Sequence, residues 1–228
     1  MTAKPLVELV DVEKSYLEGN TRRPVLSSVS ATIAPGELVV LLGRSGSGKS
    51  TLLNLLGGID RPDSGEVRVD GTAISTLEEP ARTEFRRDRV GIVYQSFNLI
   101  PTLTVLENVQ LRLELLRAPD RLGPAREWLA AVGLADRESS FPDVLSGGEQ
   151  QRVAIAAALV HNPPLILADE PTGNLDRETG RQIVDRLDAL VREHGKTLVM
   201  ATHSVDMVGI ADRVFRIEGG ELREDAAE

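Results

Sequence analysis

Residues 43–50 read Gly-Arg-Ser-Gly-Ser-Gly-Lys-Ser and match the phosphate-binding pattern G-x-x-x-x-G-K-[ST] at every fixed position. Glycines let the backbone curl until successive N–H groups converge on phosphate oxygens, and a following helix adds its positive N-terminal end. Lys49 would neutralise charge on the β- and γ-phosphates, and the Ser50 hydroxyl would ligate Mg²⁺. A Gly- and Ser-rich turn with an incidental lysine is the alternative, but the chain has only four lysines. We therefore predict a nucleotide-binding segment of Gly43, Arg44, Ser45, Gly46, Ser47, Gly48, Lys49, Ser50 and Thr51.

Two acidic residues, Asp169 and Glu170, follow the apolar run of residues 165–168. Such a run predicts a buried strand, and α/β sheets bind ligands at the carboxyl ends of their strands. We expect Asp169 to hold Mg²⁺ through water and Glu170 to polarise the attacking water as general base. A solvated carboxylate at a strand end is the alternative for Glu170, and the pairing with residues 43–50 favours the catalytic role.

A second anion site is predicted at residues 145–152, which read Leu-Ser-Gly-Gly-Glu-Gln-Gln-Arg. Ser146 and Glu149 have the spacing of a capping box, and Gly147 and Gly148 leave the N–H groups of the first helical turn bare. An ordinary capped helix is the alternative, but it would not need two destabilising glycines at its start. Here the chain closely resembles the ABC transporter ATPases, whose signature is similar to LSGGQ, although Glu149 stands where many members have Gln.

The resemblance implies that this signature closes over the γ-phosphate of ATP held by a second copy of the chain. One phosphate-binding segment and one signature per chain then give two composite sites in an ATP-dependent dimer. The signature residues expected to act in trans are Leu145, Ser146, Gly147, Gly148, Glu149 and Gln150. A P-loop kinase of small molecules lacks such a signature.

Further roles follow from the same resemblance. Tyr16 matches the aromatic residue that stacks on adenine, and Gln95 the glutamine that contacts Mg²⁺ and senses the permease. His203 matches the switch histidine that touches the γ-phosphate; its place after a predicted strand favours this role over a structural one. The loop that crosses the dimer interface is matched by Asn174, Leu175 and Asp176. ATP and Mg²⁺ are the implied cofactors, Ser50, Gln95 and Asp169 the metal-contacting residues, and Glu170, His203 and Gln95 the catalytic ones.

Four segments look like those of the MacB and lipoprotein-release (LolD-type) branch: residues 53–58, 94–101, 103–109 and 168–176. Members of this branch drive export, lipoprotein extraction or mechanical signalling across the envelope. An FtsE-type ATPase that regulates a membrane partner without transport is the alternative, because its chemistry would be identical. A soluble ABC protein acting on DNA or ribosomes usually carries a long coiled-coil insertion or two ATPase domains, and this chain has neither.

The elements that must position these residues can be predicted from apolar patterning, capping boxes and turn residues. Strands are expected at residues 6–12, 29–33, 37–42, 89–94, 165–169, 196–201 and 214–217, with a hairpin-like stretch around Val67 and Val69. Helices are expected at residues 49–56, from Thr104 to about 117, from about Pro124 to Gly133, from the capping box of Ser146 through 153–160, and at 178–194.

These elements predict an α/β fold whose core is split by a mainly helical insertion. With the resemblance, the expected fold is a P-loop NTPase (RecA-like) core with an N-terminal antiparallel β subdomain and an inserted α-helical subdomain. We predict one ABC ATPase domain over residues 1–228: β and RecA-like core at 1–95 and 153–220, helical subdomain at 96–152, and a solvated, frayed acidic tail at 221–228.

The composition is that of a soluble globular protein, with 41% hydrophobic and 27% charged residues. The net charge of −9 argues against nucleic-acid binding, and no apolar run approaches the roughly 18 residues of a membrane span. There is no cysteine and no secretory signal at the N-terminus. We therefore expect a cytoplasmic protein, held on the inner face of the cell membrane by an integral permease subunit.

The permease is expected to dock beside Gln95. Apolar residues crowd the following segment, namely Phe97, Leu99, Ile100 and Leu103. Apolar side chains at such a place are about as often core as interface, so the core remains the alternative for each of them.

Overall fold

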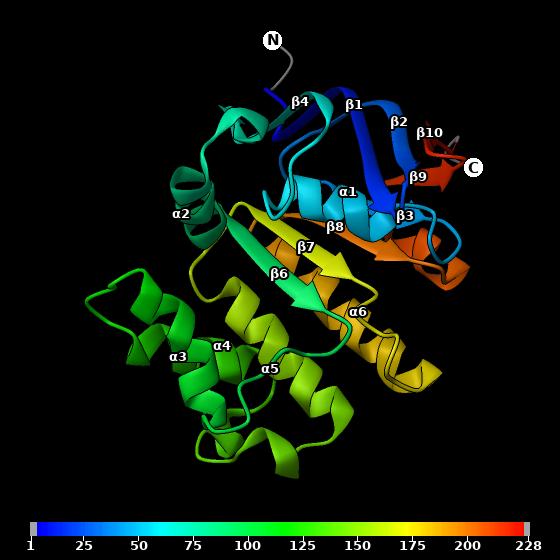
Figure 1. Cartoon of the computed structure of the whole chain (residues 1–228). Coiled ribbons are helices and arrows are strands. Elements are labelled where there is room, and N and C mark those ends of the chain that lie inside the picture. Colours follow the sequence, from blue (N-terminus) through cyan, green and yellow to red (C-terminus); the bar gives the residue numbers. More distant parts are fainter. Residues whose placement is uncertain (1–3, 226–228) are drawn as a thin grey trace.

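The computed structural model describes residues 4–225, in which strands and helices alternate around two sheets (Figure 1). The first sheet is antiparallel, with the strand order β2-β1-β4-β5. Its strands are β1 (Val7–Glu18), β2 (Thr21–Ile33), β4 (Ser64–Val69) and β5 (Thr72–Ala73). The β1–β2 hairpin is longer than the predicted strands at residues 6–12 and 29–33, because its outer half is exposed on both faces and so shows no apolar alternation.

The second sheet has the order β10-β9-β3-β8-β7-β6, and all its strands except β10 run parallel. The strands are β3 (Leu38–Leu42), β6 (Val90–Tyr94), β7 (Leu165–Asp169), β8 (Thr197–Thr202), β9 (Arg213–Glu218) and β10 (Glu221–Glu224). The central strands β3 and β8 are buried at every residue, which explains their continuous apolar sequence. The carboxyl ends of β3, β7 and β8 therefore meet at one edge.

The six-stranded sheet separates two hydrophobic cores. Helix α1 (Lys49–Leu56) lies between the two sheets in Figure 1, and its leucines pack with one core that also includes the inner face of the antiparallel sheet. The other core joins α3 (Val105–Leu115), α4 (Leu122–Ala131), α5 (Gly147–Leu159) and α6 (Arg177–Glu193) to the opposite face of the large sheet. The layers agree with the predicted α/β fold, in which an antiparallel β sheet and inserted helices accompany a mainly parallel core sheet.

The inserted helices begin where the capping residues predicted. Thr104 and Ser146 both form complete capping boxes, at α3 and α5 respectively. Two short 3-10 turns, η2 (Ala135–Arg137) and η3 (Pro142–Val144), connect α4 to α5. Because α5 runs from Gly147 to Leu159, a single helix crosses the expected boundary at residue 152 between helical subdomain and core.

Helix α2 (Glu79–Arg89) was not predicted, because it presents only Arg82 and Phe85 to the interior and shows no apolar stripe. Its charged residues pair with one another instead. Arg82 and Arg86 bind Glu79, and together they lower the pKa of this carboxyl to about 2. The remaining 3-10 turns are η1 (Ile74–Thr76) and η4 (Val205–Ile210).

The prediction of a frayed acidic tail is wrong for residues 221–225. Glu221–Glu224 form β10, which pairs with β9. Glu224 binds Arg213 and Asp225 binds Arg216, so these acidic side chains form ion pairs with arginines of the neighbouring strand. Glu228 lies outside the described residues. Among residues 4–225, no helix is both long and apolar enough to cross a membrane.

Candidate nucleotide-binding site

The loop of residues 43–48 connects β3 to α1 and has the backbone of a phosphate cradle. Gly46 and Gly48 have φ angles of 76° and 110°, which side-chain-bearing residues rarely adopt. At Gly43 an added Cβ atom would collide with the Ser47 hydroxyl, so this position is closely packed against the loop. The Ser47 hydroxyl oxygen is buried and has no hydrogen-bond partner among the residues that the structure describes. A loop with free donors at the N-terminus of a helix fits a phosphate group.

Lys49 points back into this loop. Its ammonium donates to the carbonyl oxygens of Gly43 (2.9 Å) and Arg44 (3.2 Å). It also lies 3.5 Å from the Glu170 carboxylate. Although only 6% exposed, the lysine therefore has its charge compensated. The sequence prediction placed Lys49 at the phosphates, and the structure brings it next to the predicted general base as well.

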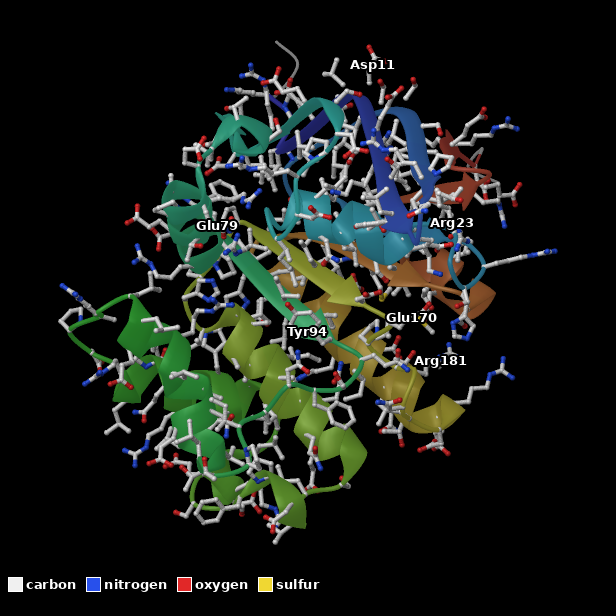
Figure 2. The ribbon with its side chains drawn as sticks, viewed as in Figure 1. Asp11, Arg23, Glu79, Tyr94, Glu170 and Arg181 are labelled. Carbon is white, nitrogen blue, oxygen red and sulfur yellow. The ribbon has the colours of Figure 1, made fainter. Side chains whose placement is uncertain are left out.

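Glu170 stands directly after β7, at the carboxyl edge of the sheet (Figure 2). Its φ angle of 46° is left-handed, and its amide donates to the Ala201 carbonyl at the end of β8 (2.9 Å). This backbone turn aims the side chain at Lys49 on one side and at His203 on the other, where His203 Nδ1 lies 2.9 Å from the carboxylate. Three residues predicted from distant segments thus meet in one cluster.

Asp169 ends β7, and its Oδ1 atom is buried and finds no hydrogen-bond partner within residues 4–225. An unpaired buried carboxylate oxygen is costly unless a cation satisfies it. Ser50, the second residue of α1, is exposed directly after the phosphate loop. Among residues 4–225, no group of three or more acidic or histidine residues could hold a metal alone. One carboxylate with neutral oxygens is the donor set that suits Mg²⁺ bound together with substrate phosphates.

Gln95 follows β6 and is tied to the loop predicted to cross the dimer interface. Its side-chain amide donates to Asn174 Oδ1 (3.2 Å), and the Asn174 side chain donates back to the Gln95 carbonyl (3.0 Å). A Cβ atom on Gly173 would collide with the Gln95 side chain, so this close approach depends on glycine. Gln95 and Asn174 are therefore coupled within one chain.

Asp176, the last residue of that loop, caps α6 by accepting from the amides of Glu178 (3.1 Å) and Thr179 (3.0 Å). The hydrogen bonds from Thr179 lower the pKa of Asp176 below its usual range. Leu175 lies beside Gly147, where an added Cβ would be 3.1 Å from its side chain. The loop therefore connects the signature helix to α6.

The signature begins α5. Ser146 Oγ accepts from the Glu149 amide (3.3 Å), and Glu149 Oε2 accepts from the Ser146 amide (2.9 Å). These bonds to the Ser146 backbone and hydroxyl lower the pKa of Glu149. A Cβ on Gly148 would collide with Thr179, so α5 and α6 meet closely here. The carboxylate of Glu149 therefore completes the cap.

The structure does not bring the signature to the phosphate loop of the same chain. Helix α5 packs in the core on one face of the six-stranded sheet, and α1 packs in the core on the other. No hydrogen bond or ion pair within residues 4–225 joins Ser146 to residues 43–51.

Two pockets flank the phosphate loop. One, of about 640 Å³, is bounded by Gly43, Arg44, Ser47, His203 and the end of β9. The other, of about 250 Å³, lies between the loop and the β1–β2 hairpin and is lined by Tyr16, Glu18, Arg23, Val25 and residues of the loop and α1. Tyr16 thus lines a pocket beside the phosphate loop. Glu18 and Arg23 were missed, because only the hairpin register, which pairs Tyr16 with Arg23, brings them to the pocket.

A family model described as ABC transporter matches residues 26–173, which include the phosphate loop, Asp169, Glu170 and the signature. The chain belongs to the ABC transporter family. It is similar over its whole length to proteins of this family, and the predicted resemblance is confirmed.

An uncharacterised ABC transporter ATP-binding protein of Mycobacterium tuberculosis is 56% identical over 97% of this chain and 90% of its own length. The lipoprotein-releasing system ATP-binding protein LolD of Geobacter metallireducens is 45% identical over 96% and 99%. MacB of Marinobacter nauticus, a macrolide export ATP-binding/permease protein, is 44% identical over 99% of this chain but only 35% of its own length. These relatives confirm the predicted likeness to the MacB and LolD-type branch.

The dimeric, post-hydrolysis structure of the ATP-binding cassette MJ0796, bound to ADP and Pi, has a TM-score of 0.88 and 43% identity to this chain. The similarity covers 96% of this chain and 97% of MJ0796. The fold described above is therefore that of an ABC cassette, and the chain is an ABC ATP-binding subunit of a transporter.

Proposed function

We propose that this ABC subunit hydrolyses ATP as a dimer and drives a separate membrane permease, in export or envelope mechanotransmission of the MacB/LolD type. The observation that carries the proposal is the cluster of Lys49, Glu170 and His203 at the carboxyl edge of the sheet. It places a cation for phosphate and an imidazole in contact with the same carboxylate. The FtsE-type alternative has no specific support among the relatives named above.

Nucleotide binding follows from the phosphate loop and its two flanking pockets. The amides of residues 43–51 would hold the phosphates, with Lys49 on the β- and γ-phosphates. The base would enter the pocket lined by Tyr16 and stack on its ring. A bound phosphate competes with Glu170 for the Lys49 ammonium, so nucleotide binding would release the carboxylate for chemistry.

Glu170 would then act as general base. Its carboxylate accepts a proton from the water that attacks the γ-phosphorus, while the bond from the γ-phosphorus to the bridging oxygen breaks and leaves ADP. His203, at 2.9 Å from the carboxylate, is placed to touch the γ-phosphate and to orient Glu170. Gln95, whose side chain is held by its hydrogen bond to Asn174, would be the third catalytic residue.

Mg²⁺ fits the oxygen atoms of Ser50, Asp169 and Gln95, of which the unpartnered Asp169 Oδ1 is the strongest indication. When bound, the ion neutralises phosphate charge during transfer. The hydrogen bond that Gln95 donates to Asn174 leaves its side-chain oxygen available for this contact.

The position of the signature supports action in trans. Its capped N-terminus lies on the other face of the sheet from α1, so a second copy would have to supply it to the phosphate loop. The dimer loop of Asn174, Leu175 and Asp176 contacts the signature helix, α6 and Gln95. It would therefore couple the two nucleotide-binding sites of the dimer.

The permease is proposed to dock on the turn between β6 and α3. Asn108, which is only 7% exposed, holds this turn. Its side-chain oxygen accepts from the Ile100 amide (2.7 Å), and its side-chain nitrogen donates to the Ile100 carbonyl (3.1 Å). Ile100 itself is 38% exposed, whereas Leu99 packs against the core. Such a rigid turn with an apolar tip suits a short amphipathic helix, which would hold the subunit at the inner face of the cell membrane.

The experiment that tests the proposed function is Glu170→Gln. The variant should bind MgATP but turn over at less than about one hundredth of the normal rate, because a general base contributes on the order of 10²–10⁴-fold. It should also accumulate as a stable dimer, since hydrolysis normally reopens the interface. Size-exclusion chromatography with and without ATP, together with phosphate release, measures both effects. A monomeric variant with near-normal turnover would contradict the proposal.

A further inference from the structure

We propose that Asp60 is a positioning residue for the nucleotide base, because it holds the ring of Tyr16 where the base stacks. The inference rests on the proposed function, in which ATP occupies the phosphate loop. Asp60 itself lines neither pocket beside that loop and would touch no nucleotide atom.

The Tyr16 ring is fastened on two sides. Its hydroxyl donates to Asp60 Oδ2 (2.9 Å), and the Lys14 ammonium lies over the ring, 5.1 Å from the centroid. The ring is nevertheless 39% exposed and lines the pocket beside the phosphate loop. With a cation over one face, a base can stack only on the other. The two contacts therefore fix both the plane and the open face of the ring.

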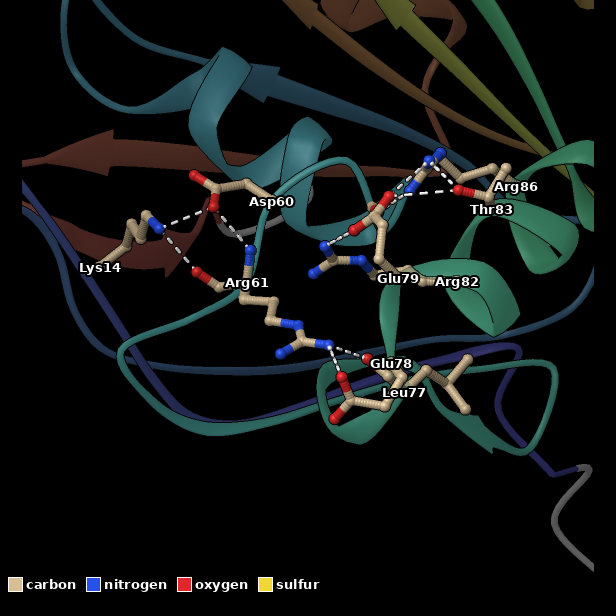
Figure 3. Close-up of polar contacts among 10 residues, drawn as sticks. Lys14, Asp60, Arg61, Leu77, Glu78, Glu79, Arg82, Thr83 and Arg86 are labelled. Carbon is tan, nitrogen blue, oxygen red and sulfur yellow. Dashed lines mark hydrogen bonds and ion pairs between the residues drawn. The ribbon is translucent and has the colours of Figure 1, made fainter.

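Asp60 is itself held tightly (Figure 3). Its Oδ1 atom accepts from the Lys14 ammonium (2.8 Å) and from the Arg61 amide (2.7 Å). Lys14 is only 9% exposed and also donates to the Arg61 carbonyl (2.7 Å). A buried cation with two oxygen partners leaves the carboxylate little freedom, so Oδ2 is presented to Tyr16 in one direction.

The same carboxylate belongs to the turn that ends α1. The amides of Ile59 (2.8 Å) and Asp60 (3.2 Å) both donate to the Asn54 carbonyl, one turn back in the helix. From the other side, Arg86 of α2 binds the Gly58 carbonyl. Helix α1 carries Lys49 at its beginning, so one rigid element of about 12 Å sets the place of the phosphates and of the base platform.

The titration behaviour of the pair agrees with this geometry. Burial would raise the pKa of Asp60, but hydrogen bonds from Lys14 and the Arg61 amide outweigh it and lower this pKa. Burial raises the pKa of the Tyr16 hydroxyl, and the adjacent Asp60 carboxylate raises it further. Tyr16 thus remains a donor and Asp60 an acceptor at neutral pH.

The test compares a ligand that has a base with one that has none. Tyr16→Phe keeps the ring and removes only its hydroxyl, and Asp60→Asn keeps the size of the acceptor. We expect each to raise the Kd of MgATP about threefold to tenfold, the cost of ordering one side chain on binding. Neither should change the Kd of magnesium tripolyphosphate. Isothermal titration calorimetry on the whole chain measures both ligands.

Coupling and a matched control make the test specific. In the double variant, Asp60→Asn should add nothing to Tyr16→Phe, because it acts through the hydroxyl that is already gone. Asp63→Asn is the control: this nearby carboxylate binds Ser15 and Arg22 but not Tyr16, and its change should leave both Kd values within twofold.

Unchanged MgATP binding in Tyr16→Phe would overturn the inference, as would equal losses for tripolyphosphate, an additive double variant, or the same loss in Asp63→Asn. If Asp60→Asn fails to fold because Lys14 loses its counter-charge, Tyr16→Phe still decides, since it leaves that ion pair intact. Failure of the unaltered chain to bind MgATP would instead contradict the proposed function.

Discussion

Lys49 has three oxygen partners within the chain, namely two loop carbonyls and Glu170, and a phosphate must compete with all of them. The same ammonium therefore serves two states. Without a phosphate it compensates the charge of Glu170, the proposed general base, and with one it would compensate the charge of the phosphate. This exchange explains why the lysine can be almost fully buried and still be available to a ligand.

We predict that Lys49→Ala weakens MgATP binding by about tenfold to a hundredfold, as expected for loss of a hydrogen-bonded charge on phosphate. A fluorescent ATP analogue titrated into the variant measures the effect. Lys196→Ala is the matched control, because Lys196 lies outside both pockets and its ammonium donates to the Asn162 carbonyl, away from the phosphate loop. Equal Kd values for the two variants would show that Lys49 does not bind phosphate.

At the scale of elements, sequence patterns predicted those helices and strands that are determined by residues within the element itself. The helix at residues 49–56, both capping boxes and the strand at 165–169 are confirmed, since each follows from glycines, caps or a continuous apolar run. The outer part of the β1–β2 hairpin, α2 and β10 were not predicted, because cross-strand partners and ion pairs hold them.

In the candidate site, too, the sequence predicted the residue types but not all of their contacts. The residue types of the Lys49, Glu170 and His203 cluster were predicted, but their mutual contacts depend on three strand ends meeting at one edge. No sequence signal indicated that Asp60 lies against Tyr16. That contact depends on how the turn after α1 packs on a hairpin some 44 residues earlier in the chain.

The two capping boxes offer a matched pair of helices. Glu149→Ala and Glu107→Ala should each lower the free energy of unfolding, because each removes the carboxylate that accepts from the amide of its N-cap residue. Only Glu149→Ala should also lower ATPase activity, because α5 carries the signature. Chemical denaturation and phosphate release measure the two effects, and Glu149→Gln should preserve the activity but lose the part of the stability that depends on the charge. An equal loss of activity in Glu107→Ala would mean that the signature cap has no special role.

The cap should also respond to pH. The pKa of Glu149 is lowered in the fold by bonds from Ser146, so its stabilisation is present above the unfolded pKa and is lost as pH falls through the folded pKa. The free energy of unfolding of the unaltered chain and of Glu149→Gln, measured as the pH is lowered, should differ by the contribution of this carboxylate.

At the scale of the whole molecule, the large sheet keeps the signature and the phosphate loop on separate cores. Ser146→Arg should therefore bind MgATP normally but fail to hydrolyse it, because the bulky cation blocks closure by the second copy. Mixed with Lys49→Ala protomers, it should regain about a quarter of the normal rate, since half of the dimers would have one intact, independent site. Loss of nucleotide binding by Ser146→Arg alone would mean that the signature acts in cis.

Ile100, in the segment between β6 and α3, is the proposed contact for the permease. Ile100→Asp should fold and keep its basal ATPase activity, but lose permease binding and stimulation, because a charge replaces an exposed apolar tip. Leu115→Asp is the control, as Leu115 is 55% exposed on α3 of the same insertion. Co-purification with the permease measures binding. Normal stimulation of Ile100→Asp would exclude this docking site.

The left-handed backbone of Glu170 has a consequence for how such a sequence can change. A side chain at a φ of 46° costs about 1–2 kcal/mol, which Gly would recover and Asn would reduce. If only heat resistance were selected, glutamate at this position would therefore tend to be replaced. Selection for ATP turnover would keep the glutamate. A thermostable descendant that has lost its activity should carry its first inactivating substitution here.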